Sequence, residues 1–258
     1  MVLNYAYCNI AVMPLHKEAA HRSEQTSQLL YGEKVEIIFA EENGWGYVRC
    51  KADAYEGWCR LSQLTIISKK DFYKDARYLV MNIGEKLLAH HAHLLLPVGA
   101  ELMRTSCEID NVVFKYKGKK QKLSEVSCDK SHLKKLAMQF LYAPYQWGGR
   151  SQMGIDCSGF TQLVYKLCGK ALSRDASQQA SEGNVVDFLI NAQIGDLAFF
   201  DNDEGRINHV GLLLDHETII HATDTAGCVV VDKIDQGGII SSKLRKRTHN
   251  LRLVKRYF

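Results

Sequence analysis

The spacing of apolar residues changes once along this chain, and that change most constrains its fold. Up to about residue 128, short apolar runs alternate with turn chemistry, as in Lys34 to Ala40, the turn Glu42-Asn43-Gly44, and Trp45 to Cys50. From Ser131 the spacing becomes helical, with apolar residues at Leu133, Leu136, Ala137 and Phe140. The sequence therefore predicts a strand-rich front part followed by a domain that opens with a helix.

The last domain reads as α+β. Ser131 is expected to cap the first helix, Pro144 to stop it, and a second helix is expected from Cys157 to Leu167, ended by Gly169. Apolar runs then suggest strands at 197–200, 209–214, 219–222 and 229–231. We expect a papain-like arrangement, with helices packed on a mainly antiparallel sheet.

The front part divides into two predicted domains. Residues 1–67 fit a small β-barrel whose closing segment, Glu56-Gly57-Trp58-Cys59-Arg60-Leu61, resembles the end of a bacterial SH3-like domain. Residues 68–128 repeat this style less clearly and are predicted to form a second, divergent SH3-like barrel. The α+β domain is predicted to span residues 129–258.

Composition limits the function classes. Hydrophobic residues are 46% and charged residues 24% of the 258, which is ordinary globular usage. The net charge is only +4, and the one basic cluster, Lys243, Arg245, Lys246 and Arg247, fits a solvated face or strand edge better than a nucleic-acid site. No apolar run approaches the roughly 20 residues that span a bilayer, so we expect no membrane span.

Eight cysteines are scattered without a CxxC pair or a compact disulfide framework. Together with a first segment that lacks the pattern of an export signal, they predict free thiols and a cytoplasmic location. A periplasmic or cell-envelope location is the alternative, if a signal peptide has been removed.

Cys157 stands out among these cysteines. It lies in Gly154-Ile155-Asp156-Cys157-Ser158-Gly159, a glycine-flanked turn that leads into the second helix. The positive end of the helix dipole favours a thiolate, and its free N–H groups can hold an oxyanion, so we expect a nucleophile with a pKa below about 8.5. The other cysteines lack this setting and are predicted to be structural.

A thiolate nucleophile needs a proton carrier, and histidine suits that role near neutral pH. His209 begins one predicted strand and His221 closes the next, 12 positions later. Adjacent antiparallel strands would bring both to one end of the sheet. His209 is the expected general base and His221 the group that orients it.

Five motifs occur in the order found in NlpC-type cysteine endopeptidases: Tyr145-Gln146-Trp147-Gly148-Gly149, Asp156-Cys157-Ser158-Gly159-Phe160, Ile194-Gly195-Asp196-Leu197, His209-Val210-Gly211 and Ile220-His221-Ala222. The match covers about residues 131–256. With the SH3-like segments in front, the chain resembles the γ-D-glutamyl-L-diamino acid endopeptidases of this family, which act on peptidoglycan stem peptides.

The resemblance implies roles for the matching positions. Cys157 would be the nucleophile, forming a thioester, and Tyr145 would lie near the oxyanion. Asp156, Ser158 and Asp175 match positions that line the substrate pocket. Where some relatives have serine after that last aspartate, this chain has Ala176, so one hydroxyl contact is missing.

In relatives that cleave stem peptides with a free N-terminal L-Ala, a front-domain tyrosine and an acid bind the amine. Tyr55 matches that tyrosine, and Glu24 is a looser match for the acid. A carboxylate facing an ammonium gives a charge-assisted hydrogen bond, and a blocked groove selects chain ends. This implies a preference for free muropeptides.

Three rival interpretations remain: a thiol acyltransferase on the same fold, a non-catalytic wall-binding protein, and a zinc site built from the same cysteine and histidines, for which three ligands at this spacing are a poor set. We expect no metal and no cofactor. The sequence leaves open the oligomeric state and the choice between diaminopimelate and lysine.

Overall fold

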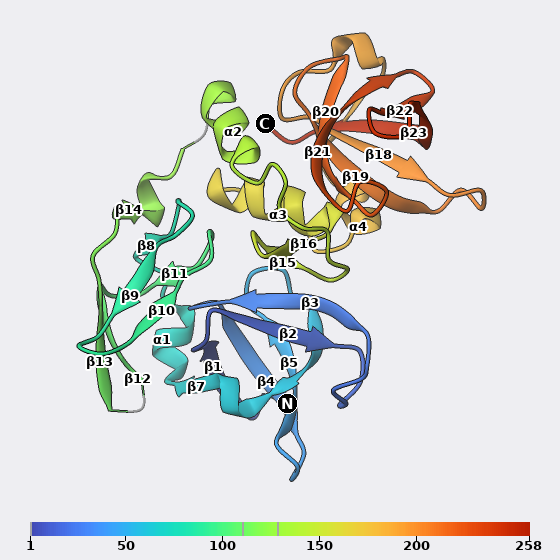
Figure 1. The fold of residues 1–258 in the computed structure, drawn as a ribbon. Helices are drawn as coiled ribbons and strands as arrows, with labels where there is room; N and C mark the ends of the chain where they lie inside the picture. The colour runs from blue at the N-terminus through green and yellow to red at the C-terminus, as the bar shows by residue number, and fades with distance from the viewer. Residues whose placement is uncertain (1, 110, 128) are drawn as a thin grey trace. The chain divides into compact units, whose positions relative to one another are not determined.

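The computed structural model describes residues 2–109, 111–127 and 129–258 and divides the chain into two compact units (Figure 1). The first unit comprises residues 1–126 together with the short segment 148–152. The second comprises residues 127–147 and 153–258. The chain thus leaves the second unit once, between two of its own helices, and returns to it.

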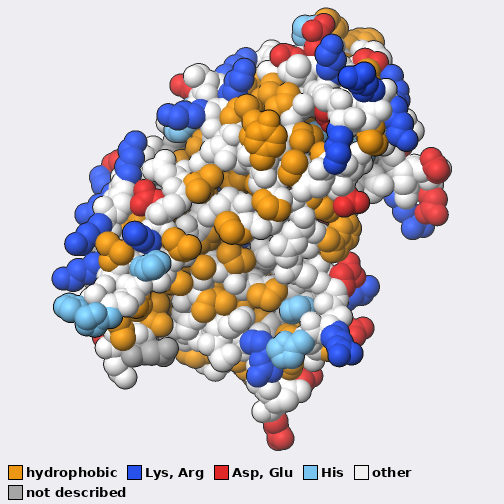
Figure 2. Space-filling view, in the orientation of Figure 1, with side chains coloured by type: hydrophobic (Ala, Val, Ile, Leu, Met, Phe, Trp, Pro, Cys, Tyr) orange, Lys and Arg blue, Asp and Glu red, His pale blue; other side chains and the backbone are white. Residues whose placement is uncertain are grey.

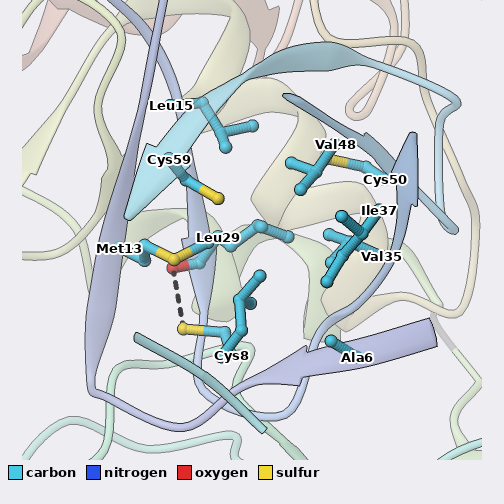
Figure 3. Packing of buried hydrophobic residues seen from close by; sticks show 11 residues of the cluster. Ala6, Cys8, Met13, Leu15, Leu29, Val35, Ile37, Val48, Cys50 and Cys59 are labelled. Atoms are coloured by element: carbon cyan, nitrogen blue, oxygen red, sulfur yellow. Dashed lines mark hydrogen bonds between the residues drawn. The ribbon is translucent and has the colours of Figure 1, made fainter. Parts of the chain in front are cut away.

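The first unit begins with a seven-stranded sheet whose neighbouring strands are antiparallel. Its order is β3-β2-β6-β5-β4-β1-β7, built from β1 (Asn4–Cys8), β2 (Val12–His16), β3 (Gln25–Leu30), β4 (Lys34–Ala40), β5 (Trp45–Cys50), β6 (Glu56–Arg60) and β7 (Leu64–Ile67). Alternating residues turn inward, as the buried Met13 and Leu15 of β2 show, and Figure 3 shows such side chains meeting in one apolar core. That core includes the free thiols Cys8, Cys50 and Cys59.

The rest of the first unit consists of short strands around a separate core. After α1 (Lys69–Tyr73), one sheet has the order β10-β9-β13-β12 and another the order β11-β8-β14. These strands are β8 (Tyr78–Leu79), β9 (Lys86–Leu88), β10 (His93–Leu95), β11 (Glu101–Leu102), β12 (Ser106–Ile109), β13 (Val112–Tyr116) and β14 (Gln121–Lys122). Tyr31, which follows β3, packs into their core, and its hydroxyl donates a hydrogen bond to Cys107 Sγ at 3.1 Å.

The second unit carries three helices, α2 (Lys130–Met138), α3 (Cys157–Leu167) and α4 (Ala176–Ser181), before most of its strands. Its seven-stranded sheet is built from β17 (Asn184–Val186), β18 (Leu197–Asp201), β19 (Ile207–Leu213), β20 (Thr218–Thr223), β21 (Cys228–Asp235), β22 (Gly238–Ser241) and β23 (Lys246–Arg256). Their order is β17-β23-β18-β19-β20-β21-β22, and β22 also pairs with β23. Six strands therefore close on themselves, and α3 packs against β19 and β20.

Several elements lie where the apolar pattern predicted them. β4, β5 and α3 have the predicted bounds, and Gly169 follows α3 at a φ of +76°. The predicted cap of α2 was wrong: Asp129, not Ser131, is the N-cap, because its carboxylate accepts the N–H of His132 at 2.7 Å. The helix also ends at Met138, before the stop expected at Pro144.

The cysteines and surface charges can be compared with expectation in the described residues. Six cysteines are free thiols, but Cys168 is disulfide-bonded, so the prediction of free thiols was wrong for that residue. No helix within the described ranges has the length and apolarity needed to span a membrane. Lys and Arg side chains are spread over several places of the face shown in Figure 2, with carboxylates among them, and Arg247 is paired with Asp235 at 2.6 Å.

Candidate active site

Cys157 is the first residue of α3, and the preceding Asp156 is the N-cap. Asp156 has an extended backbone, and its Oδ1 accepts the N–H of Gly159 at 2.7 Å. The helix is buried along nearly its whole length, with Phe160 and Leu163 fully enclosed. The start of α3 is therefore held firmly, and the thiol is fixed at the positive end of the helix dipole.

The surroundings of the thiol differ from the sequence-based expectation in one respect. Burial raises the pKa of Cys157 to about 12, and the charge of Asp156 acts in the same direction. The backbone N–H groups of Val210 and Ser158 and the guanidinium of Arg174 oppose this rise without cancelling it. The expected low pKa was wrong, because only 7% of Cys157 is exposed and burial is the largest influence on its pKa.

The two histidines lie on neighbouring antiparallel strands, as their spacing predicted. His209 is on β19, His221 is on β20, and His209 Nε2 is 2.8 Å from His221 Nδ1. Burial, followed by the charges of His221 and His249, holds the pKa of His209 well below its usual 6.5. His209 is therefore a neutral imidazole at neutral pH and can accept a proton.

The thiol and the base are brought together by the packing of α3 against β19. The backbone N–H of Val210, the residue that follows His209, lies near enough to the Cys157 thiol to lower its pKa. Since His209 Nε2 is engaged by His221, its Nδ1 is the nitrogen left for the thiol. Nδ1 is also the ring nitrogen nearer the backbone.

Two residues next to the histidines were not singled out from the sequence. Asp232 on β21 lies 3.3 Å from His221, between Oδ2 and Nε2. His249 on β23 stacks on His209, with ring centroids 4.1 Å apart and an interplanar angle of 25°. The alternation of β21 could have indicated Asp232, because His221 pairs with Val230 and Asp232 shares that residue's face.

Arg174 is another residue that the sequence did not single out, and it contacts both predicted pocket residues, Asp156 and Ser158. Its Nη2 is 2.5 Å from Asp156 Oδ2, and its Nη1 donates to Ser158 Oγ at 2.8 Å. Arg174 is only 2% exposed, so its charge is compensated by a carboxylate as buried charges require. This ion pair fixes the side chains on both sides of Cys157.

Tyr145 and Asp175 also belong to the second unit. Tyr145 is half-buried, and burial followed by the charges of Cys157 and Asp156 raises its pKa, which indicates that its hydroxyl lies in their neighbourhood. Asp175 is the N-cap of α4, and its N–H donates to the Gln178 side chain at 3.1 Å. Their contacts with substrate remain predictions.

Tyr55 and Glu24 belong to the first unit. Tyr55 packs against the core of the seven-stranded sheet, and its N–H donates to Asp53 at 3.0 Å. Glu24 forms an exposed ion pair with Lys17 at 3.5 Å. Their predicted role in binding a substrate amine remains a prediction.

Comparisons with known proteins agree with this site. Residues 142–248 match the NlpC/P60 family, and residues 15–64 match the bacterial dipeptidyl-peptidase Sh3 domain. A gamma-D-glutamyl-L-lysine dipeptidyl-peptidase of Bacillus subtilis (strain 168) is 31% identical over 80% of this chain and 74% of its own length. Dipeptidyl-peptidase 6 of Lysinibacillus sphaericus is 28% identical over 88% of this chain and 91% of its own.

A solved structure supports the fold of the whole chain. The crystal structure of an NlpC/P60 family protein from Bacillus cereus has a TM-score of 0.80 at 20% identity, covering 98% of this chain and 99% of that one. At this identity the likeness speaks for the fold alone. The family match, the 31% identical relative and the cysteine with its two histidines together show that the chain belongs to the NlpC/P60 family and is a cysteine peptidase.

Proposed function

We propose that this peptidase hydrolyses the γ-D-glutamyl-L-diamino acid amide of peptidoglycan stem peptides that carry a free N-terminal L-Ala. The observation that carries the chemistry is the neutral His209, hydrogen-bonded to His221 and followed in the chain by Val210, whose N–H lies near the Cys157 thiol and lowers its pKa. The names of the relatives from Bacillus subtilis and Lysinibacillus sphaericus support the choice of bond and the dipeptide as product.

Acylation follows from the neutral resting state. His209 Nδ1 takes the thiol proton while the sulfur attacks the γ-carbonyl carbon of D-Glu, so that no stable thiolate is needed beforehand. N–H groups at the start of α3 and the Tyr145 hydroxyl stabilise the oxyanion. The protonated imidazole then gives its proton to the departing amine of the diamino acid, and a thioester remains on Cys157.

Deacylation reverses the proton path. Water enters where the amine left, His209 removes a proton from it, and the oxygen attacks the thioester carbon. The sulfur departs and recovers the proton from His209, which releases L-Ala-D-Glu with a free γ-carboxylate. The acid Glu24 and the phenol of Tyr55 are proposed to bind the free amine of the substrate, so that an acetylated end is refused.

The substrate is tested by mass spectrometry of L-Ala-γ-D-Glu-diaminopimelate and L-Ala-γ-D-Glu-L-Lys, each offered free and N-acetylated. We expect L-Ala-D-Glu from a free peptide only, no product with Cys157→Ala, and unchanged product with Cys228→Ala, which removes another free thiol. Cleavage of the acetylated peptides would refute the amine requirement. No cleavage of any peptide, with acyl transfer to an added amine, would favour the acyltransferase.

A further inference from the structure

A buried carboxylate, that of Asp232, extends the histidine pair. Asp232 Oδ2 lies 3.3 Å from His221 Nε2, and His221 Nδ1 lies 2.8 Å from His209 Nε2. These groups are all at least nine-tenths buried, with exposures of 4%, 1% and 7%. Two contacts therefore link a carboxylate on β21 to the base on β19.

The protonation state of Asp232 decides which atoms donate and which accept in these two contacts. Burial would raise the pKa of Asp232, but hydrogen bonds from His221 and from Ser242 lower it below its ordinary value. The N–H of Ser242 donates to Asp232 Oδ1 at 2.8 Å. The carboxylate is thus ionised and can only accept hydrogen bonds.

Each ring then has one tautomer. Because Asp232 only accepts, His221 carries its proton on Nε2, and its Nδ1 is a bare acceptor. His209 must therefore donate from Nε2, which leaves the lone pair on Nδ1, the nitrogen that His221 does not engage. Reversing any one proton would place N–H against N–H or lone pair against lone pair.

A hollow in the surface lies next to Asp232. Asp232 and Ser242 line a hollow of about 570 Å³ whose lining also includes Lys134 and Lys243. Positive side chains near a carboxylate favour its ionised form. Neither His221 nor Cys157 is among the residues that line it.

We propose that Asp232 is a positioning residue that, through His221, holds His209 in the tautomer able to take the thiol proton. This rests on the proposed roles of Cys157 and His209. Its effect on catalysis is indirect, since the Asp232 carboxylate bonds to His221 and Ser242 and neither of these is the nucleophile or the base.

Asp232→Asn is the sharpest test, because the amide has the same shape. The Ser242 N–H needs an acceptor, so the amide oxygen faces Ser242 and the amide NH2 faces His221. His221 must then accept at Nε2 and donate from Nδ1, and His209 must carry its proton on Nδ1. Both tautomers reverse, and the base loses its lone pair toward the thiol.

Nitrogen-15 NMR of histidine-labelled protein reads the tautomers directly. In the unaltered protein we expect the proton on Nε2 of both rings, and in Asp232→Asn on Nδ1 of both. The kcat should fall on the order of 100-fold in the variant while KM changes little, as expected when a base is held in the wrong tautomer. Asp235→Asn, on the same strand but paired with Arg247 at the surface, should change neither reading.

The NMR reading separates this proposal from the proposed function. Protons on Nδ1 in the unaltered protein would overturn it even if Asp232→Asn failed to fold. Unchanged tautomers in a folded Asp232→Asn variant would also overturn it, even with activity lost. If no stem peptide is cleaved but the tautomers reverse as stated, the substrate is wrong and the positioning role stands.

Discussion

Burial of the thiol and of its base sets how Cys157 can react. With a thiol pKa of about 12 and a His209 pKa well below 6.5, a proton shared at rest would stay on sulfur. A preformed thiolate–imidazolium pair would require the opposite order of the two values. The enzyme should therefore create its thiolate only as the substrate carbonyl arrives.

Alkylation of Cys157 by iodoacetamide tests this order. The thiolate fraction grows about tenfold per pH unit below the thiol pKa, so the rate should keep rising from pH 6 to pH 10 without a plateau. Mass spectrometry of the peptide that contains Cys157 measures the rate at this site, and Cys157→Ala gives the background. A plateau reached below pH 7 would instead mean that the pair is ionic at rest.

The same burial gives the histidines an unfavourable effect on stability in acid. A folded-state pKa below the unfolded value means that the unfolded chain binds more protons, so stability is complete above about 6.5 and falls as the pH drops below it. For His249, burial followed by the charge of His221 lowers the pKa to about 4, which sets the lower end of its window.

At the scale of elements, the site depends on how closely β19 and β20 approach. A Cβ built on Gly211 would lie 2.6 Å from Ile219 Cδ1 and 2.9 Å from His221 Cβ. Any side chain at this position must therefore push β20, and His221 with it, away from β19. Glycine is required here for space, since Gly211 has an ordinary strand setting within β19.

Gly211→Ala should consequently cost both stability and activity. We expect about 1–3 kcal/mol less free energy of unfolding, as for overpacked cores, and a lower kcat because the His209–His221 bond lengthens. Denaturant titration and peptide cleavage measure the two effects. Gly205→Ala is the matched control: a Cβ there meets nothing within 4 Å, so about 1 kcal/mol of strain at its φ of +75° should leave kcat intact.

The sequence was most informative where apolar spacing was regular. The bounds of α3, β4 and β5 follow directly from it, and the pairing of His209 with His221 follows from two adjacent strands. β23 was missed, because the polar run Lys246-Arg247-Thr248-His249-Asn250 hides its alternation. Asp232 and Arg174 were not predicted for a related reason. Their roles depend on partners in other elements, His221 and Asp156, which the local spacing of residues does not reveal.

For the molecule as a whole, the most informative contact is that of Arg150. This residue lies in the segment 148–152, which belongs to the first unit although the catalytic unit flanks it in sequence. Its Nη1 and Nη2 lie 2.9 and 3.1 Å from the two carboxylate oxygens of Glu33, and Nη1 also donates to the Gln28 carbonyl at 2.6 Å. Arg150 and Glu33 are only 4% and 3% exposed, so water solvates neither charge to any great extent.

A buried two-point ion pair of this kind should show strong coupling in a double-mutant cycle. Glu33→Gln and Arg150→Gln should each lower the free energy of unfolding by about 3–5 kcal/mol, because each removes the ion-pair partner of a buried charge. The double variant should lose clearly less than the sum, since it contains neither member of the pair and therefore leaves neither without the other. Denaturant unfolding measures all three.

The exposed pair Lys122 and Glu125, 2.6 Å apart with half of each side chain in solvent, is the control and should couple by no more than about 1 kcal/mol. Additive losses at Glu33 and Arg150 would mean that water reaches the pair. A folded single variant that shows the coupling and also loses peptide cleavage would have a further meaning. It would show that the ion pair in the segment between Trp147 and Met153 matters for catalysis as well as for stability.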